Sequence, residues 1–211
     1  NWQKTVDAAV RGLHYFPGNS RLIAMQAIGY NQMGKYESAI NLLDEAIASA
    51  DSTDTELMSE LYTTKGDSYY AWEKKDSAFA AYSKAIELNP NNLGALNNCA
   101  YYLACEDRDL DKAEAMILKV VSEKPEDGTS LDTYAWVLFK KQDYVKAKEV
   151  IDGALENESA PSAELYEHAG DIYFMNKEPD EALEFWRKAL ALDPDNDLLK
   201  RKVKHKTFYY K

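Results

Sequence analysis

Small residues recur at intervals of 34 to 39 residues along most of the chain, each within a segment that has the apolar spacing of a helix. The first series consists of Ala27, Gly66, Ala100, Ala135 and Gly170. The second consists of Ala39, Ala78, Ala113, Ala147 and Ala182. The third, seven residues further on each time, consists of Ala46, Ala85, Val120, Ala154 and Ala189. A fixed period of this length predicts stacked copies of one small structural unit.

Large apolar residues stand between the second and third series in every copy. They are Leu43, Tyr82, Ile117, Ile151 and Trp186. Two helices can approach closely where small side chains meet, and bulky residues at the neighbouring turns then fill the remaining space. One helical hairpin cannot bury its apolar face alone, so it has to stack on the next hairpin. The 9 Gly and 6 Pro are too few for an all-β chain of 211 residues, so we expect an all-α protein.

Two segments carry the clearest version of the pattern, and they resemble the tetratricopeptide repeat. Residues 59–92 contain Gly66, Tyr69, Ala78, Tyr82, Ala85 and Pro90. Residues 163–195 contain Gly170, Tyr173, Ala182, Trp186, Ala189 and Pro194. The run from Leu131 to Trp136 is similar to first-helix segments of bacterial repeat proteins. The resemblance implies a right-handed α-solenoid of five helical hairpins.

The same three series of small residues predict how the chain is divided into repeats. Residues 2–15 fit only the second helix of a repeat, so we expect a truncated repeat at the start and further repeats upstream. The final segment has one apolar stripe and basic residues on the opposite face, which is typical of a helix that caps a solenoid. The expected parts are a truncated repeat at 1–18, five repeats at 20–54, 55–92, 93–127, 128–161 and 162–194, and a capping helix at 195–211.

The charge distribution argues against a nucleic-acid partner. Residues 1–199 hold 19 basic and 36 acidic residues, a charge of −17, and such a body repels phosphate backbones. Residues 200–211 add six basic residues and no acid, and we expect them to form a solvated helix face. No stretch approaches the roughly 18 apolar residues that a membrane span requires.

Chemistry-bearing motifs are missing from the sequence. The three histidines, His14, His168 and His205, lack the spacing of metal ligands, and there is no Gly-rich phosphate loop. Carboxylate pairs are common, but they stand among Lys and Arg on helix faces that we expect to be solvated. We therefore expect no enzymatic activity, no metal and no cofactor.

In the family that this chain resembles, the first helices of the repeats line a concave groove that receives a partner peptide. The groove candidates carried over from that resemblance are Asp67, Tyr70, Asn97, Asn98, Tyr101, Asp132, Trp136, Phe139, Asp171 and Phe174. Asn can pair with peptide backbone, aromatics supply contact area, and carboxylates favour a basic ligand. The alternative for Tyr101 and Trp136 is that they pack against neighbouring helices.

One specialised use of such a groove is not expected. Cochaperones of the family hold a C-terminal carboxylate with Lys, Arg and Asn at fixed groove positions. The corresponding positions here are Ala24, Ile28, Thr64, Gly94 and Asn98, which form no basic clamp.

These features predict a non-catalytic scaffold that binds a protein or peptide, including one of basic character, in its groove. Two alternatives stay open. One is a structural module that self-associates through the edge at residues 2–15, and the other is the regulatory portion of a larger protein whose catalytic part is elsewhere. The resemblance to bacterial proteins fits both the cytoplasm and the cell envelope, as a periplasmic protein or a lipoprotein.

Overall fold

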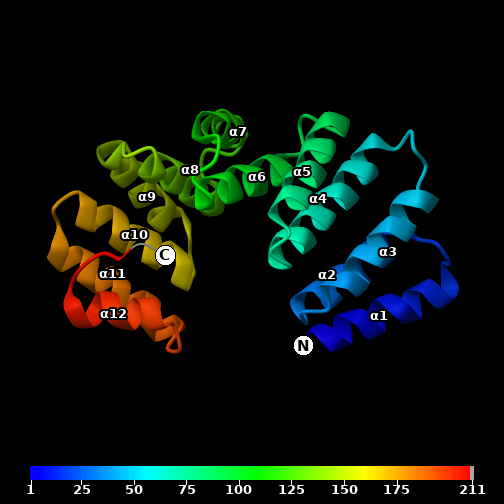
Figure 1. Cartoon of the computed structure of the whole chain (residues 1–211), viewed down its shortest axis with the longest axis horizontal. Helices are drawn as coiled ribbons and strands as arrows, with labels where there is room; N and C mark the ends of the chain where they lie inside the picture. The colour runs from blue at the N-terminus through cyan, green and yellow to red at the C-terminus, as the bar shows by residue number, and fades with distance from the viewer. Residues whose placement is uncertain (210–211) are drawn as a thin grey trace. The chain divides into compact units, whose positions relative to one another are not determined.

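The computed structural model describes residues 1–209, and within that range every regular element is a helix (Figure 1). This confirms the expected all-α fold. The helices are α1 (Trp2–Tyr15), α2 (Ser20–Gln32), α3 (Tyr36–Ser49), α4 (Thr55–Ala71), α5 (Lys75–Leu88), α6 (Leu93–Cys105), α7 (Leu110–Glu123), α8 (Gly128–Lys140), α9 (Tyr144–Asn157), α10 (Ala163–Met175), α11 (Pro179–Leu192) and α12 (Asp197–His205).

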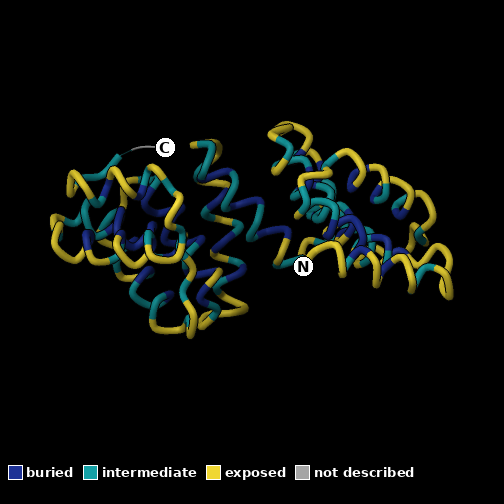
Figure 2. Tube along the Cα trace, turned by 90° about the horizontal axis from the view of Figure 1, so that it is seen from below, coloured by how far each residue is buried: buried dark blue, intermediate teal, exposed yellow. Residues whose placement is uncertain are grey.

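The chain forms two compact units, the first at residues 1–99 and the second from residue 100 onward. In the first unit, α2 packs against α3 and α4 against α5, while α1 lies against α2. In the second unit, α8 packs against α9 and α10 against α11, with α12 against α11. Buried positions in each unit lie on the inner sides of the helices, and exposed positions lie on the outer turns (Figure 2).

The small-residue series form the seams within these hairpins, and every member of the three series is buried. At two seams the first helix has to carry glycine. A Cβ added at Gly66 would lie 2.6 Å from Cε1 of Tyr82, and one added at Gly170 would lie 2.5 Å from Nε1 of Trp186. The large aromatic ring of the second helix therefore occupies the space that a side chain on the first helix would need.

Local signals in the sequence explain where the helices begin. The side chains of Asp54, Asp127 and Ser162 accept hydrogen bonds from backbone N–H groups in the first turns of α4, α8 and α10. The polar linker at residues 51–54 thus ends in a helix cap.

Four of the hairpin turns place one residue in the left-handed region of backbone conformation. These residues are Gly34, Glu73, Gln142 and Lys177, with φ angles from 59° to 71°. Only the first of them is glycine, so the other three turns accept a conformation that a residue with a Cβ rarely adopts.

Helix α12 covers the apolar end of the last hairpin, where Leu199 joins the buried cluster around Trp186. The expectation that its basic residues form only a solvated face is wrong for one of them. Lys202 is completely buried, because two acidic side chains of α10 pair with its ammonium group.

Candidate binding site

In the first unit, three of the groove candidates form a polar cluster on α4 and α6. Asp67 accepts a hydrogen bond from the hydroxyl of Tyr82 at 2.5 Å and another from Nδ2 of Asn98 at 3.0 Å. Asn98 in turn accepts a long one of 3.4 Å from Nδ2 of Asn97. Burial raises the pKa of the Asp67 carboxyl above its usual value, although the two donors oppose the rise. Tyr70, the fourth candidate in this unit, is half-buried on α4.

One atom in this cluster has no partner. The side-chain oxygen of Asn97 is buried, and no group among residues 1–209 donates to it. A buried acceptor without a donor is costly, so a structure with a stable core contains few of them.

In the second unit, the candidates Trp136 and Phe139 take part in a stack of three rings. The ring of Phe139 lies parallel to the indole of Trp136 at a centroid distance of 4.8 Å. The imidazole of His168, from α10, stacks on the same indole at 4.1 Å. Tyr101 approaches His168 at 6.1 Å, and its hydroxyl donates to the carboxylate of Glu164. Stacked rings at these distances attract each other beyond the area they bury.

The imidazole in this stack has an acidic partner. Nδ1 of His168 lies 2.8 Å from Oδ1 of Asp132 on α8. Complete burial of His168 would lower its pKa, but Asp132, with smaller contributions from Glu164 and Asp171, raises the pKa above its usual value. Asp132 is thus engaged inside the unit.

Asp171 is also engaged inside the unit. Its Oδ1 accepts a hydrogen bond from Nε1 of Trp186 at 2.9 Å, and its two oxygens lie 2.7 and 2.8 Å from Nζ of Lys202. Glu167, one helical turn earlier, binds the same ammonium group at 2.8 Å. Burial raises the pKa of Asp171 to about 6 even though Lys202 opposes the rise.

Phe174 has a different environment from the other aromatic candidates. It is half-buried at the end of α10, where its ring lies 5.6 Å from the indole of Trp186, and it packs against the apolar cluster that Leu199 completes. In this structure its contacts are those of a packing residue.

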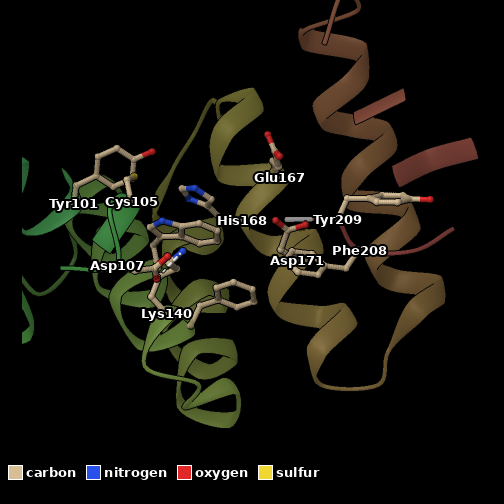
Figure 3. Close-up of a pocket in the computed structure, with 11 residues that line it drawn as sticks. Tyr101, Cys105, Asp107, Lys140, Glu167, His168, Asp171, Phe208 and Tyr209 are labelled. Carbon is tan, nitrogen blue, oxygen red and sulfur yellow. Dashed lines mark ion pairs between the residues drawn. The ribbon is translucent and has the colours of Figure 1, made fainter. Parts of the chain in front are cut away.

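The second unit also contains a cavity of about 140 Å³ beside the ring stack (Figure 3). It is lined by Tyr101, Cys105, Asp107, Trp136, Phe139, Lys140, Glu167, His168, Asp171, Phe208 and Tyr209. Four of the groove candidates therefore meet at one place, although they come from three helices. Within the described part of the chain, Nε1 of Trp136 is buried without a hydrogen-bond partner.

Sequence reasoning missed most of the other residues that line this cavity, namely Cys105, Asp107, Lys140, His168, Phe208 and Tyr209. It also missed Lys202, which pairs with Asp171. One signal was present in the spacing. Asp67 contacts Tyr82 and Asn98, which lie 15 and 31 residues further on, and Asp171 contacts Trp186 and Lys202 at the same two separations. A search for polar pairs at these separations would have linked Asp171 to Lys202.

Antiparallel hairpins with small-residue seams define a helical-hairpin repeat protein. Among residues 1–209, no three potential metal ligands gather in one place, and no helix has the length and apolar character to cross a bilayer.

Comparisons with known proteins give the family. Residues 59–92 and residues 163–196 each match a family model described as tetratricopeptide repeat. No curated protein sequence matches the chain significantly.

Solved structures agree on the fold. A tetratricopeptide repeat protein from Parabacteroides merdae is 21% identical, with 97% of this chain and 77% of that chain covered and a TM-score of 0.71. A chain of the APC/C hetero-tetramer Cut9–Hcn1 is 15% identical and has a TM-score of 0.81. The match covers 99% of this chain and 40% of that chain. YrrB, described as a repeat protein with an unusual peptide-binding site, is 18% identical and has a TM-score of 0.61. The match covers 94% of this chain and 99% of that chain.

Residues 59–92 and 163–196 are therefore tetratricopeptide repeats, and the chain has the fold of proteins built from such repeats. Proteins built from these repeats are generally non-catalytic scaffolds for protein–protein interaction. At these identities, the similar structures establish the fold alone.

Proposed function

We propose that this chain is a non-catalytic scaffold that binds a segment of a partner protein on the aromatic surface of its second unit. The observation that carries the proposal is the cavity of about 140 Å³, where Tyr101 from α6, Trp136 and Phe139 from α8, and Asp171 from α10 meet. Concave sites with aromatic walls and a few polar groups are typical places for a ligand. YrrB, which shares the fold, is described as having a peptide-binding site.

The charges of the candidates favour apolar over ionic recognition. Asp67, Asp132 and Asp171 each have a donor from their own unit. A basic partner would have to displace these donors before it gained an ion pair, and desolvated pairs often contribute little net free energy. Aromatic side chains therefore supply most of the recognition in this proposal, and a basic residue of the partner adds to it only at the edge.

A random peptide library displayed on phage tests this function without a known partner. Peptides selected on the wild-type protein should lose about tenfold or more in affinity on the Tyr101→Ala variant, a loss of about 1.4 kcal/mol in binding free energy. Val145→Ala, at an exposed position of α9, is the matched control and should change nothing. Selected peptides that bind Tyr101→Ala and wild type equally would contradict the proposal.

Self-association through α1 is a second candidate, because this helix exposes large apolar side chains. Trp2, Val10 and Tyr15 of the helix, and Phe16 directly after it, are between 45% and 75% exposed. Exposed apolar groups of this size often mark an interface. Light scattering should then show a dimer in the wild type and a monomer in Val10→Lys, whereas a monomeric wild type would reject this candidate.

A further inference from the structure

The segment that follows α12 folds back onto the candidate binding site. Helix α12 ends at His205, and Lys206 adopts a left-handed conformation with φ 52°, which reverses the chain. The backbone N–H of Thr207 then bonds to the carbonyl of Lys202 at 3.3 Å. Phe208 and Tyr209 become part of the cavity wall (Figure 3).

Phe208 contacts the binding surface itself. Its ring meets the ring of Phe139 on α8 edge-to-face, at a centroid distance of 5.9 Å and an interplanar angle of 68°. Nζ of Lys202 lies 5.5 Å from the centre of the same ring. This is the contact that a partner's aromatic side chain would make with the end of the ring stack.

Tyr209, in contrast, is held by the helix that it follows. The guanidinium of Arg201 lies 4.5 Å from its ring centre, and its hydroxyl is 2.6 Å from Nδ1 of His205. The segment therefore has an anchor on α12 that is independent of Phe208. Phe208 also packs against the cluster that contains Trp186 and Leu199, but no backbone hydrogen bond of α12 depends on its side chain, so its departure need not unfold the helix.

The space beside Phe208 is about that of one aromatic ring while Phe208 forms part of the wall, and it becomes larger when Phe208 leaves. The cavity measures about 140 Å³, and an engineered cavity of about 150 Å³ in another protein holds benzene. The acids that line it are paired inside the unit, Glu167 and Asp171 with Lys202, and Asp107 with Lys140. The surface is therefore complementary to an uncharged ring, and the indole of Trp136 and the ring of Phe139 provide its wall.

We infer that Phe208 is an internal ligand of this surface, and that the partner is a peptide segment whose aromatic side chain displaces it. The inference rests on the proposed function, because it names the chemistry of the partner and the competitor at the same site. A tethered ligand acts at an effective concentration in the millimolar range. It therefore lowers the apparent affinity of every partner by the same factor, which is set by the ratio of that concentration to the dissociation constant of the tethered ligand itself.

The test uses the full chain and a defined probe. The probe is a fluorescein-labelled peptide with the sequence of residues 204–209, and its binding is followed by fluorescence anisotropy. The Phe208→Ala protein should bind the probe at least tenfold more tightly than the wild type does. A probe with alanine in place of Phe208 should bind neither protein, and Phe16→Ala, which removes an exposed ring from the first unit, should behave like the wild type.

Three results would overturn the inference. They are equal affinity of wild type and Phe208→Ala for the probe, equal binding of the alanine probe, and a large fall in the melting temperature of Phe208→Ala, which would make Phe208 a structural wall. The double variant Phe208→Ala with Tyr101→Ala should lose the gain in probe affinity. If library peptides still depend on Tyr101 while the probe result is negative, the inference fails and the proposed function stands; if they do not depend on Tyr101, the function itself fails.

Discussion

Asp171 and Trp186 are joined by a hydrogen bond of 2.9 Å from the indole nitrogen to the carboxylate, and the residue before Asp171 is the glycine that makes room for the same indole. Gly66, Asp67 and Tyr82 repeat this arrangement in the first unit. The seam of a hairpin and a polar position on its first helix are therefore coupled through one aromatic side chain.

The first prediction concerns that seam. Gly170→Ala should destabilise the protein by about 1–3 kcal/mol, because the new Cβ would overlap the Trp186 ring. Gly153→Ala is the matched control, since its new Cβ would meet only Leu131 at 3.8 Å. This control should stabilise α9 by about 0.5–1 kcal/mol. Urea denaturation measures both, and equal effects of the two substitutions would contradict the close approach.

The second prediction concerns the buried cation. Lys202→Met should cost about 3–5 kcal/mol in the free energy of unfolding at neutral pH, because Glu167 and Asp171 would keep buried charges without a partner. The exposed Lys200→Met change should have little effect. Chemical denaturation of the two variants gives the comparison.

The same variant should show a defined pH dependence. The pKa of Asp171 in the fold is about 6, above its usual value of 3.8, so the neutral form is favoured in the folded state. The stability that this group contributes is complete below pH 3.8 and falls as the pH rises through 6. Lys202→Met removes the opposing cation, so the loss in the free energy of unfolding relative to the wild type should be larger at pH 8 than at pH 5. A deficit that does not change with pH would contradict this assignment.

The third prediction concerns His168. Its pKa lies above 6.5 because Asp132 outweighs the effect of burial, so its contribution to stability is present below pH 6.5 and is lost as the pH rises through the folded-state pKa. In Asp132→Asn, burial should dominate and the pKa should fall below that of the wild type. Imidazole resonances of His168, measured by NMR as a function of pH in the wild type and in the variant, test this. An unchanged titration of His168 would show that Asp132 has no such role.

The fourth prediction concerns the hairpin turns. Lys177 is exposed and has φ 67°, so Lys177→Gly should raise the free energy of unfolding by about 1 kcal/mol through relief of the left-handed conformation. Gly34, at φ 71°, is the reverse case, and Gly34→Ala should lower the free energy by a similar amount. Thermal melts followed by circular dichroism distinguish these signs. A stabilised Gly34→Ala variant would be the opposite of what the turn geometry requires.

The fold was accessible from the sequence because each hairpin buries the same columns. The small residues recur at a fixed period, and Tyr82 and Trp186 stand between alanines. This pattern indicates which faces of the helices pack against each other. No contact between distant parts of the chain had to be inferred, since each hairpin is a local unit that repeats.

The candidate site was less accessible because its chemistry depends on side-chain pairs between helices. The positions of Asp132 and Asp171 within their repeats predicted carboxylates available to a partner protein, but His168 and Lys202 pair with them. The path of the segment after α12 lies outside the repeat pattern, so nothing in the columns placed Phe208 against Phe139.

The most direct test of the proposed binding surface is an NMR titration of the ¹⁵N-labelled protein with a library-selected peptide. The account predicts that shift changes gather on the second unit, at the indole N–H of Trp136 and at the backbone amides of Tyr101, Phe139 and His168. Changes confined to the first unit, for example at the exposed Met25 and Ile28 of α2, would contradict it.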